Sequence, residues 1–184
     1  MLSNNHVFAH VNQAQPGDDL YQPGPADGGT AANHFAELTR YVTIQLNGNA
    51  NRVDAAIGEL IVNANRTREI CTIGRLAGTG QATEGMLVCK HGRTTGYTEG
   101  TISDESYDAE VDMGTAGYAL FKDQMRIEAN PGTAFALGGD SGSLIVETAT
   151  KRAVGLFFAG PDSGEYGLAN PLAQVLTELE IELI

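Results

Sequence analysis

Residues 138–146 read Gly138-Gly139-Asp140-Ser141-Gly142-Ser143-Leu144-Ile145-Val146, a glycine-rich turn that runs directly into an apolar segment. The glycines on either side of Asp140 and Ser141 permit a tight turn in which the backbone N–H groups of Gly139 and Ser141 converge. The apolar, partly β-branched residues that follow predict a buried strand that holds this turn in place. A serine hydroxyl attacks an acyl carbon only with a base beside it and with donors ready for the oxyanion. The turn therefore indicates nucleophilic chemistry at Ser141, and the plainer alternative is a glycine-rich turn between two strands.

The composition around this turn predicts a soluble chain with a substantial core. It has 184 residues, of which 42% are hydrophobic, which suits one compact domain or two small ones that share an interface. The net charge of −12 argues against nucleic acid and against an anionic membrane as partners. No segment approaches the ~20 apolar residues of a membrane helix. Residues 1–5, which precede His6, do not form a signal peptide, and this favours a cytoplasmic location.

Short apolar segments alternate with turn signals along the chain, and this pattern is typical of an all-β protein. Residues 12–33 are expected to form a long loop, residues 41–46 a strand, and residues 70–73 another strand within a connection. Asn170 and Pro171 form an N-cap and first-turn pair, and the apolar spacing after them predicts a short C-terminal helix. Further strands are expected at residues 85–90, 94–103, 107–113, 120–128, 143–147, 153–159 and 164–169.

A base beside Ser141 has to come from one of the four histidines, which are His6, His10, His34 and His91. His6 lies at the end of an apolar strand that opens into the long loop, where its side chain can face a cleft. The other three lie in polar loops or in a turn and are expected at the surface. The base also needs a carboxylate behind it. Asp54 is surrounded by apolar residues and so needs a partner, although a role as a strand or turn cap is an equal alternative.

The two cysteines, Cys71 and Cys89, do not have the spacing of a zinc site or of a redox motif. They form either one disulfide or two buried thiols. The sequence predicts no metal site and no cofactor.

The sequence around His6 (S-N-N-H-V), Asp54 (V-D-A-A-I) and Ser141 (G-D-S-G-S) resembles the trypsin-like, chymotrypsin-fold serine peptidases, in their order and with similar spacing. Residues 90–102 are similar to the first strands of the second barrel in bacterial members of this family. Residues 154–160 resemble the strand that lines the substrate cleft. The resemblance covers nearly the whole chain from His6 onward.

The resemblance implies two antiparallel β-barrels with the catalytic groups in the cleft between them. Ser141 would attack the acyl carbon, His6 would act as general base and then as general acid, and Asp54 would hold His6. The backbone amides of Gly139 and Ser141 would supply the oxyanion hole. The resemblance also implies walls of the first specificity pocket, which would be Phe135, Ala136, Leu137, Phe158, Ala159 and Gly160.

Two details of the substrate side follow from the same resemblance. Phe135 stands where trypsin-type enzymes keep an acid, so a preference for arginine or lysine is not expected, and an apolar or small side chain fits these walls better. Asp140, buried before the nucleophile, needs a cation. Arg93 matches the position from which some bacterial relatives supply an arginine, and its fixed fork suits a carboxylate. A solvated Arg93 in a turn is the alternative.

The chain departs from the family at its front, where two or three strands normally precede the histidine. We therefore expect residues 1–75 to form a truncated first barrel that carries His6 and Asp54, and residues 76–184 to form the second barrel with Ser141 and the terminal helix. An incomplete barrel exposes strand edges and apolar interior. This predicts a homo-oligomer in which residues 1–60 of the copies cover one another.

Three functions remain open from the sequence. The first is the hydrolysis of peptide bonds through an acyl-enzyme. The second is the hydrolysis of carboxylic esters on the same triad, since the leaving group of an ester is easier to expel than an amine. The third is a non-catalytic interaction module in which the triad is misaligned.

Overall fold

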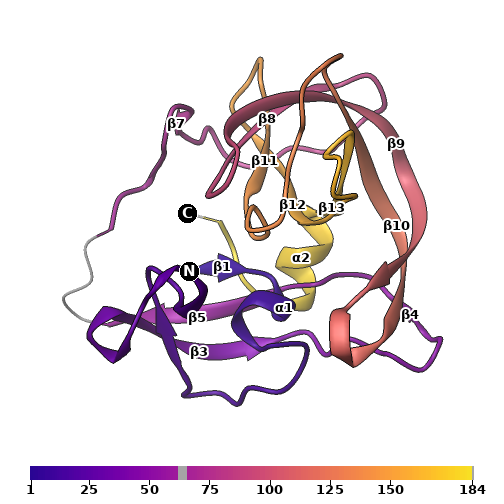
Figure 1. Ribbon diagram of the computed structural model, residues 1–184. Helices are drawn as coiled ribbons and strands as arrows, with labels where there is room; N and C mark the ends of the chain where they lie inside the picture. Colours follow the sequence, from indigo (N-terminus) through magenta and orange to yellow (C-terminus); the bar gives the residue numbers. More distant parts are fainter. Residues whose placement is uncertain (62–65, 184) are drawn as a thin grey trace.

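The computed structural model describes residues 1–61 and 66–183 of the chain. Within these residues the N-terminal part builds one β-sheet and the C-terminal part builds a larger one beside it (Figure 1). In the described part of the chain, no helix has the length and apolar composition needed to cross a bilayer.

The first sheet is antiparallel, with the strand order β1-β5-β3-β2. Its strands alternate between a buried and an exposed face, as in β3, where Ala36 and Leu38 are buried and Glu37 is exposed. The short helix α1 (Asn5–Phe8) adds Phe8 to the apolar cluster on the buried face. The strands of this sheet are β1 (Leu2–Ser3), β2 (Asp19–Tyr21), β3 (His34–Tyr41) and β5 (Ala56–Leu60).

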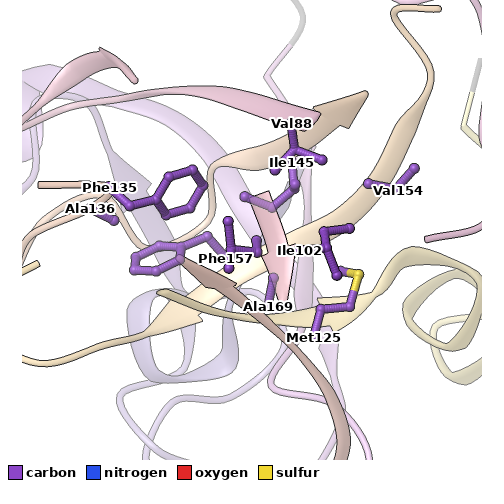
Figure 2. Close-up of a cluster of buried hydrophobic side chains, with 10 residues drawn as sticks. Val88, Ile102, Met125, Phe135, Ala136, Ile145, Val154, Phe157 and Ala169 are labelled. Atoms are coloured by element: carbon purple, nitrogen blue, oxygen red, sulfur yellow. The ribbon is translucent and has the colours of Figure 1, made fainter. Parts of the chain in front are cut away.

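The second sheet closes into a barrel because β13 pairs with β10 as well as with β12. Its interior is filled by apolar side chains from every wall, among them Phe135, Phe157 and Met125 (Figure 2). Strand β4 (Ala50–Asn51) adds to this sheet in parallel beside β10. The barrel strands are β8 (Leu87–Gly92), β9 (Gly96–Asp112), β10 (Tyr118–Ala129), β11 (Leu144–Glu147), β12 (Ala153–Ala159) and β13 (Tyr166–Pro171).

The C-terminal helix α2 (Leu172–Glu178) packs between the two parts of the chain. Its buried residues Leu172 and Val175 share one cluster with Leu156 of β12 and with Val53 and Ala55, which precede β5. The remaining short elements are a two-stranded hairpin, β6 (Glu69–Ile70) with β7 (Gly74–Arg75), and three 3-10 turns, η1 (Pro25–Asp27), η2 (Ala31–Asn33) and η3 (Gly114–Ala116).

The predicted all-β architecture with a short C-terminal helix is confirmed. The strand predicted at residues 41–46 is wrong, because β3 ends at Tyr41. The backbone N–H of Ile44 donates to Oδ1 of Asn12 at 2.9 Å, and Nδ2 of Asn12 donates to the carbonyl of Ile44 at 2.8 Å. The Asn12 side chain thus makes the two hydrogen bonds to the Ile44 backbone that a neighbouring strand would otherwise make.

Three other local predictions need correction. Of the strand expected at residues 70–73, Ile70 ends β6 and residues 71–73 form the turn of the β6–β7 hairpin. The strands expected at 94–103 and 107–113 are one continuous strand, β9. Residues 12–33 contain the short strand β2. Cys71 is exposed and Cys89 is buried, and both are free thiols in the described part of the chain.

The structure is that of one chain, so the predicted homo-oligomer stays a prediction, as does the domain boundary between residues 75 and 76.

Candidate active site

His6 and Asp54, which are far apart in the sequence, lie in direct contact. Nδ1 of His6 is 2.5 Å from Oδ2 of Asp54, and the backbone N–H of His6 donates to Oδ1 of Asp54 at 3.1 Å. The Asp54 side chain is fully buried, whereas 26% of the His6 side chain is exposed. A carboxylate at Nδ1 fixes the ring and leaves Nε2 as the nitrogen that can exchange a proton at the surface. The sequence suggested that His6 lies at the end of a strand, but the structure places it on the helix α1.

A buried polar network holds the backbone of Asp54. Its N–H donates to Oδ1 of Asn170 at 3.0 Å, and its carbonyl accepts a hydrogen bond from Nδ2 of Asn4 at 2.8 Å. Nδ2 of Asn170 donates in turn to Oε1 of Gln124 at 2.5 Å. All of these side chains are buried, and hydrogen bonds between buried polar groups hold their members in one arrangement. Among the described residues, Oδ1 of Asn4 makes no hydrogen bond.

Asn170 therefore does not cap the terminal helix, as the sequence predicted. It belongs to β13, and Pro171 occupies the N-cap position. The signal for its actual role was the single polar side chain directly after the apolar residues Leu168 and Ala169, because a buried polar group needs a partner.

Ser141 lies in the turn between Leu137 and β11. Gly139 and Gly142 have φ of +98° and +88°, a backbone conformation that glycine adopts without strain. In the described part of the chain, the N–H groups of Gly139 and Ser141 make no hydrogen bond. An oxyanion needs donors of this kind, and the oxyanion hole at Gly139 and Ser141 stays a prediction.

Asp140 anchors this turn with both of its carboxylate oxygens. Oδ1 accepts hydrogen bonds from the backbone N–H groups of Thr94 at 2.7 Å and Thr95 at 3.1 Å. Oδ2 accepts hydrogen bonds from the Thr95 hydroxyl at 2.7 Å and from the Leu137 N–H at 3.0 Å. The turn before the nucleophile is thus tied to the β8–β9 connection.

The cation beside Asp140 is Lys90, and the predicted Arg93–Asp140 pair is wrong. Nζ of Lys90 lies 3.3 Å from Oδ2 of Asp140, and both side chains are fully buried. Arg93 pairs instead with Asp27, through Nε at 2.9 Å, and 56% of its side chain is exposed. Lys90 lies within β8 and points into the protein, whereas Arg93 lies in the turn after that strand. Sequence reasoning passed over Lys90 because lysine is almost never fully buried unless it is paired.

Burial and hydrogen bonding act in opposite directions on this ion pair. Burial raises the pKa of the Asp140 carboxyl, but the hydrogen bonds from Leu137, Thr95 and Thr94 outweigh it, so the pKa lies below its ordinary value of 3.8. Burial lowers the pKa of the Lys90 ammonium, and the Asp140 carboxylate opposes that shift.

The lowered pKa of Asp140 predicts how stability changes with pH. Its carboxylate contributes stability that is fully present above pH 3.8 and is lost as the pH falls through the folded-state pKa. We expect the free energy of unfolding of the wild type to approach that of Asp140→Asn as the pH drops below this value. Urea denaturation over a pH series measures both proteins. A difference between them that does not change with pH would contradict the prediction.

His6 and Ser141 line the same cavity, which has a volume of about 670 Å³. In the described part of the chain no hydrogen bond joins the two side chains, and Oγ of Ser141 lies 3.5 Å from the carbonyl oxygen of Phe158. Catalytic hydrogen bonds are often long in the absence of substrate and tighten only in the complex. The arrangement therefore places the His6 imidazole and the Ser141 hydroxyl on the wall of one cavity.

Most of the predicted pocket walls also line this cavity, namely Ala136, Leu137, Phe158, Ala159 and Gly160. Phe135 does not line the cavity, because it is fully buried in the barrel core (Figure 2). The centroid of its ring lies 6.5 Å from the centroid of the Phe157 ring. The sequence did not predict the contribution of the β9–β10 hairpin, which adds Val111 and Met113 to the lining.

No protein-family model matches the sequence, and no curated protein matches it significantly. Solved structures do match over the whole of this chain. They include chymotrypsin from Cellulomonas bogoriensis (TM-score 0.64, 20% identity, 100% of this chain and 84% of that chain). They also include the Nocardiopsis protease NAPase (TM-score 0.66, 18% identity, 100% and 84%) and Thermobifida fusca protease A (TM-score 0.65, 19% identity, 100% and 83%).

At these identities the similarity establishes the fold. The resemblance seen in the sequence is confirmed at that level, and the closed second barrel and the C-terminal helix agree with it. The chain has the chymotrypsin fold of bacterial serine proteases.

Proposed function

We propose that the protein is a serine hydrolase that cleaves peptide bonds through an acyl-enzyme. The observation that supports this most strongly is the buried Asp54 carboxylate against Nδ1 of His6, with His6 and Ser141 on the wall of one cavity. The matching structures are proteases by name, which favours a peptide as the substrate.

In the proposed reaction, Oγ of Ser141 attacks the carbonyl carbon and its proton passes to Nε2 of His6. The N–H groups of Gly139 and Ser141 stabilise the oxyanion that forms. His6 then gives its proton to the departing amine, which leaves an ester on Ser141. Water attacks this ester with His6 again as the base, which releases the acid and restores the hydroxyl. Asp54 stays ionised throughout and stabilises the imidazolium.

The first experiment treats the full chain with an organophosphonate probe and measures its intact mass. We expect one probe to be added, at Ser141. Turnover of p-nitrophenyl esters together with cleavage of casein supports the peptidase. Ester turnover without casein cleavage assigns the esterase activity instead. No labelling would contradict both and favour the interaction module.

Peptide p-nitroanilides test the specificity pocket. The apolar walls Ala136, Leu137 and Phe158 favour a small or apolar side chain before the scissile bond. Faster cleavage after arginine would contradict this preference. It would assign recognition to the acids that also line the cavity, which are Glu110, Asp112 and Asp162.

A further inference from the structure

A cluster of metal-ligating side chains lies on the first sheet, outside the candidate active site. Asp19 of β2 and His34 and Glu37 of β3 each offer one nitrogen or oxygen atom, and these atoms all lie within 4.8 Å of one another. None of the three residues lines the cavity that holds Ser141. Strand pairing places them together, because Asp19 is directly opposite Glu37, and a bulge then brings Tyr21 opposite His34.

The carboxylates of this cluster repel one another. Asp19 is the cross-strand neighbour of Glu37, and Glu37 is also the neighbour of Glu59 on β5. Like charges directly opposite each other destabilise a sheet. Within residues 1–61 and 66–183, no lysine or arginine forms an ion pair with Asp19, Glu37 or Glu59. A bound cation would remove this repulsion.

His34 supplies an independent sign of a ligand. Its Nε2 atom is buried, although 26% of the side chain is exposed, and it makes no hydrogen bond to any described residue. Its ionic neighbour among these residues is the Asp19 carboxylate. The same atom lies 3.4 Å from Oδ1 of Asp19. Two ligand atoms on one tetrahedral zinc ion, with bonds of 2.0–2.1 Å, are about 3.4 Å apart.

The other carboxylate oxygen of Asp19, Oδ2, is oriented by a hydrogen bond from a residue that is not part of the cluster. The hydroxyl of Tyr21 donates to Oδ2 of Asp19 at 3.1 Å, so Oδ1 is the oxygen that faces His34. Carboxylates and imidazoles that bind metals are commonly oriented by such outer contacts. The exposed Glu37 side chain completes the donor set from the neighbouring strand.

We propose that Asp19, His34 and Glu37 bind a divalent transition-metal ion of the zinc class. An imidazole nitrogen with two carboxylates suits zinc, whereas calcium and magnesium prefer oxygen ligands alone. The ion joins the short edge strand β2 to β3, so its role is to stabilise the sheet. This inference does not depend on the proposed hydrolase activity.

Titration calorimetry with zinc chloride tests the site on the full chain, in the Ser141→Ala background so that self-cleavage plays no part. We expect one zinc ion per chain, a higher melting temperature with zinc, and no such effect from calcium. His34→Gln and Glu37→Gln should each weaken binding by about tenfold or more. His10→Asn is the matched control, since His10 is exposed at φ +48°, a conformation that asparagine tolerates, and it should bind zinc as before.

Two results would overturn the proposal. One is the absence of binding heat together with an unchanged melting temperature. The other is equal zinc affinity in the parent and in the Glu37→Gln variant, which would place the metal elsewhere. Glu37 is exposed, so this variant is expected to fold even if His34→Gln does not.

Discussion

Ser141→Ala is expected to reduce the turnover of esters and peptides by about 10⁴-fold or more, while the protein stays folded. Without Oγ no acyl-enzyme forms, and only the binding groups and the oxyanion donors remain. The side chain is partly buried and, among the described residues, makes one long hydrogen bond, to the Phe158 carbonyl, so the loss of stability is small. Initial rates with p-nitrophenyl esters, with circular dichroism as the folding check, measure both effects.

The control for this variant is Ser163→Ala, which changes an exposed serine that does not line the cavity. It should keep the wild-type rate. The double variant His6→Ala/Ser141→Ala should be no slower than Ser141→Ala alone, because residues that act as a unit do not lose activity additively. Wild-type ester turnover in Ser141→Ala would refute the proposed nucleophile.

Lys90→Met is expected to lower the free energy of unfolding by about 3–5 kcal/mol, because it leaves the buried Asp140 carboxylate without its cation. The methionine fills most of the same space, so the missing charge dominates the effect. The turn that carries Ser141 depends on Asp140, so labelling by the phosphonate should also slow. Urea denaturation gives the first quantity and the rate of mass increase gives the second.

Arg93→Ala is the matched control, since it breaks an ion pair of similar chemistry at the surface. Exposed pairs contribute about 0–1 kcal/mol, so its loss should lie in that range. The double variant Lys90→Met/Asp140→Asn should recover part of the stability that Lys90→Met loses, because no unpaired charge remains. If Arg93→Ala cost as much as Lys90→Met, the assignment of the buried cation to Lys90 would be refuted.

The sequence predicted the features that depend on local pattern. The turn around Ser141 needed glycines at fixed positions, and the barrel strands β8, β11 and β12 coincide with short apolar runs. It failed where a tertiary contact overrides local preference. Asn12 replaces a strand at Ile44, and the helix that carries His6 is one short turn, too short for periodicity to reveal.

In the candidate site, too, local pattern predicted some features, and tertiary contacts determined others. The order of His6, Asp54 and Ser141 was readable, whereas the choice between Lys90 and Arg93 depends on which side chain points inward, and strand pairing decides that. The cluster of Asp19, His34 and Glu37 has no motif spacing, because the register of β2 against β3 creates it.

The network behind Asp54 has a consequence for the time at which the proposed activity appears during synthesis. The backbone of Asp54 is held by Asn4 at one side and by Asn170 at the other. A ribosome makes Asn170 long after Ser141, so a nascent chain already carries the hydroxyl while the support for the Asp54–His6 pair is missing. On the proposed mechanism, we expect the unfinished polypeptide to lack hydrolase activity until β13, which carries Asn170, has been synthesised and has docked.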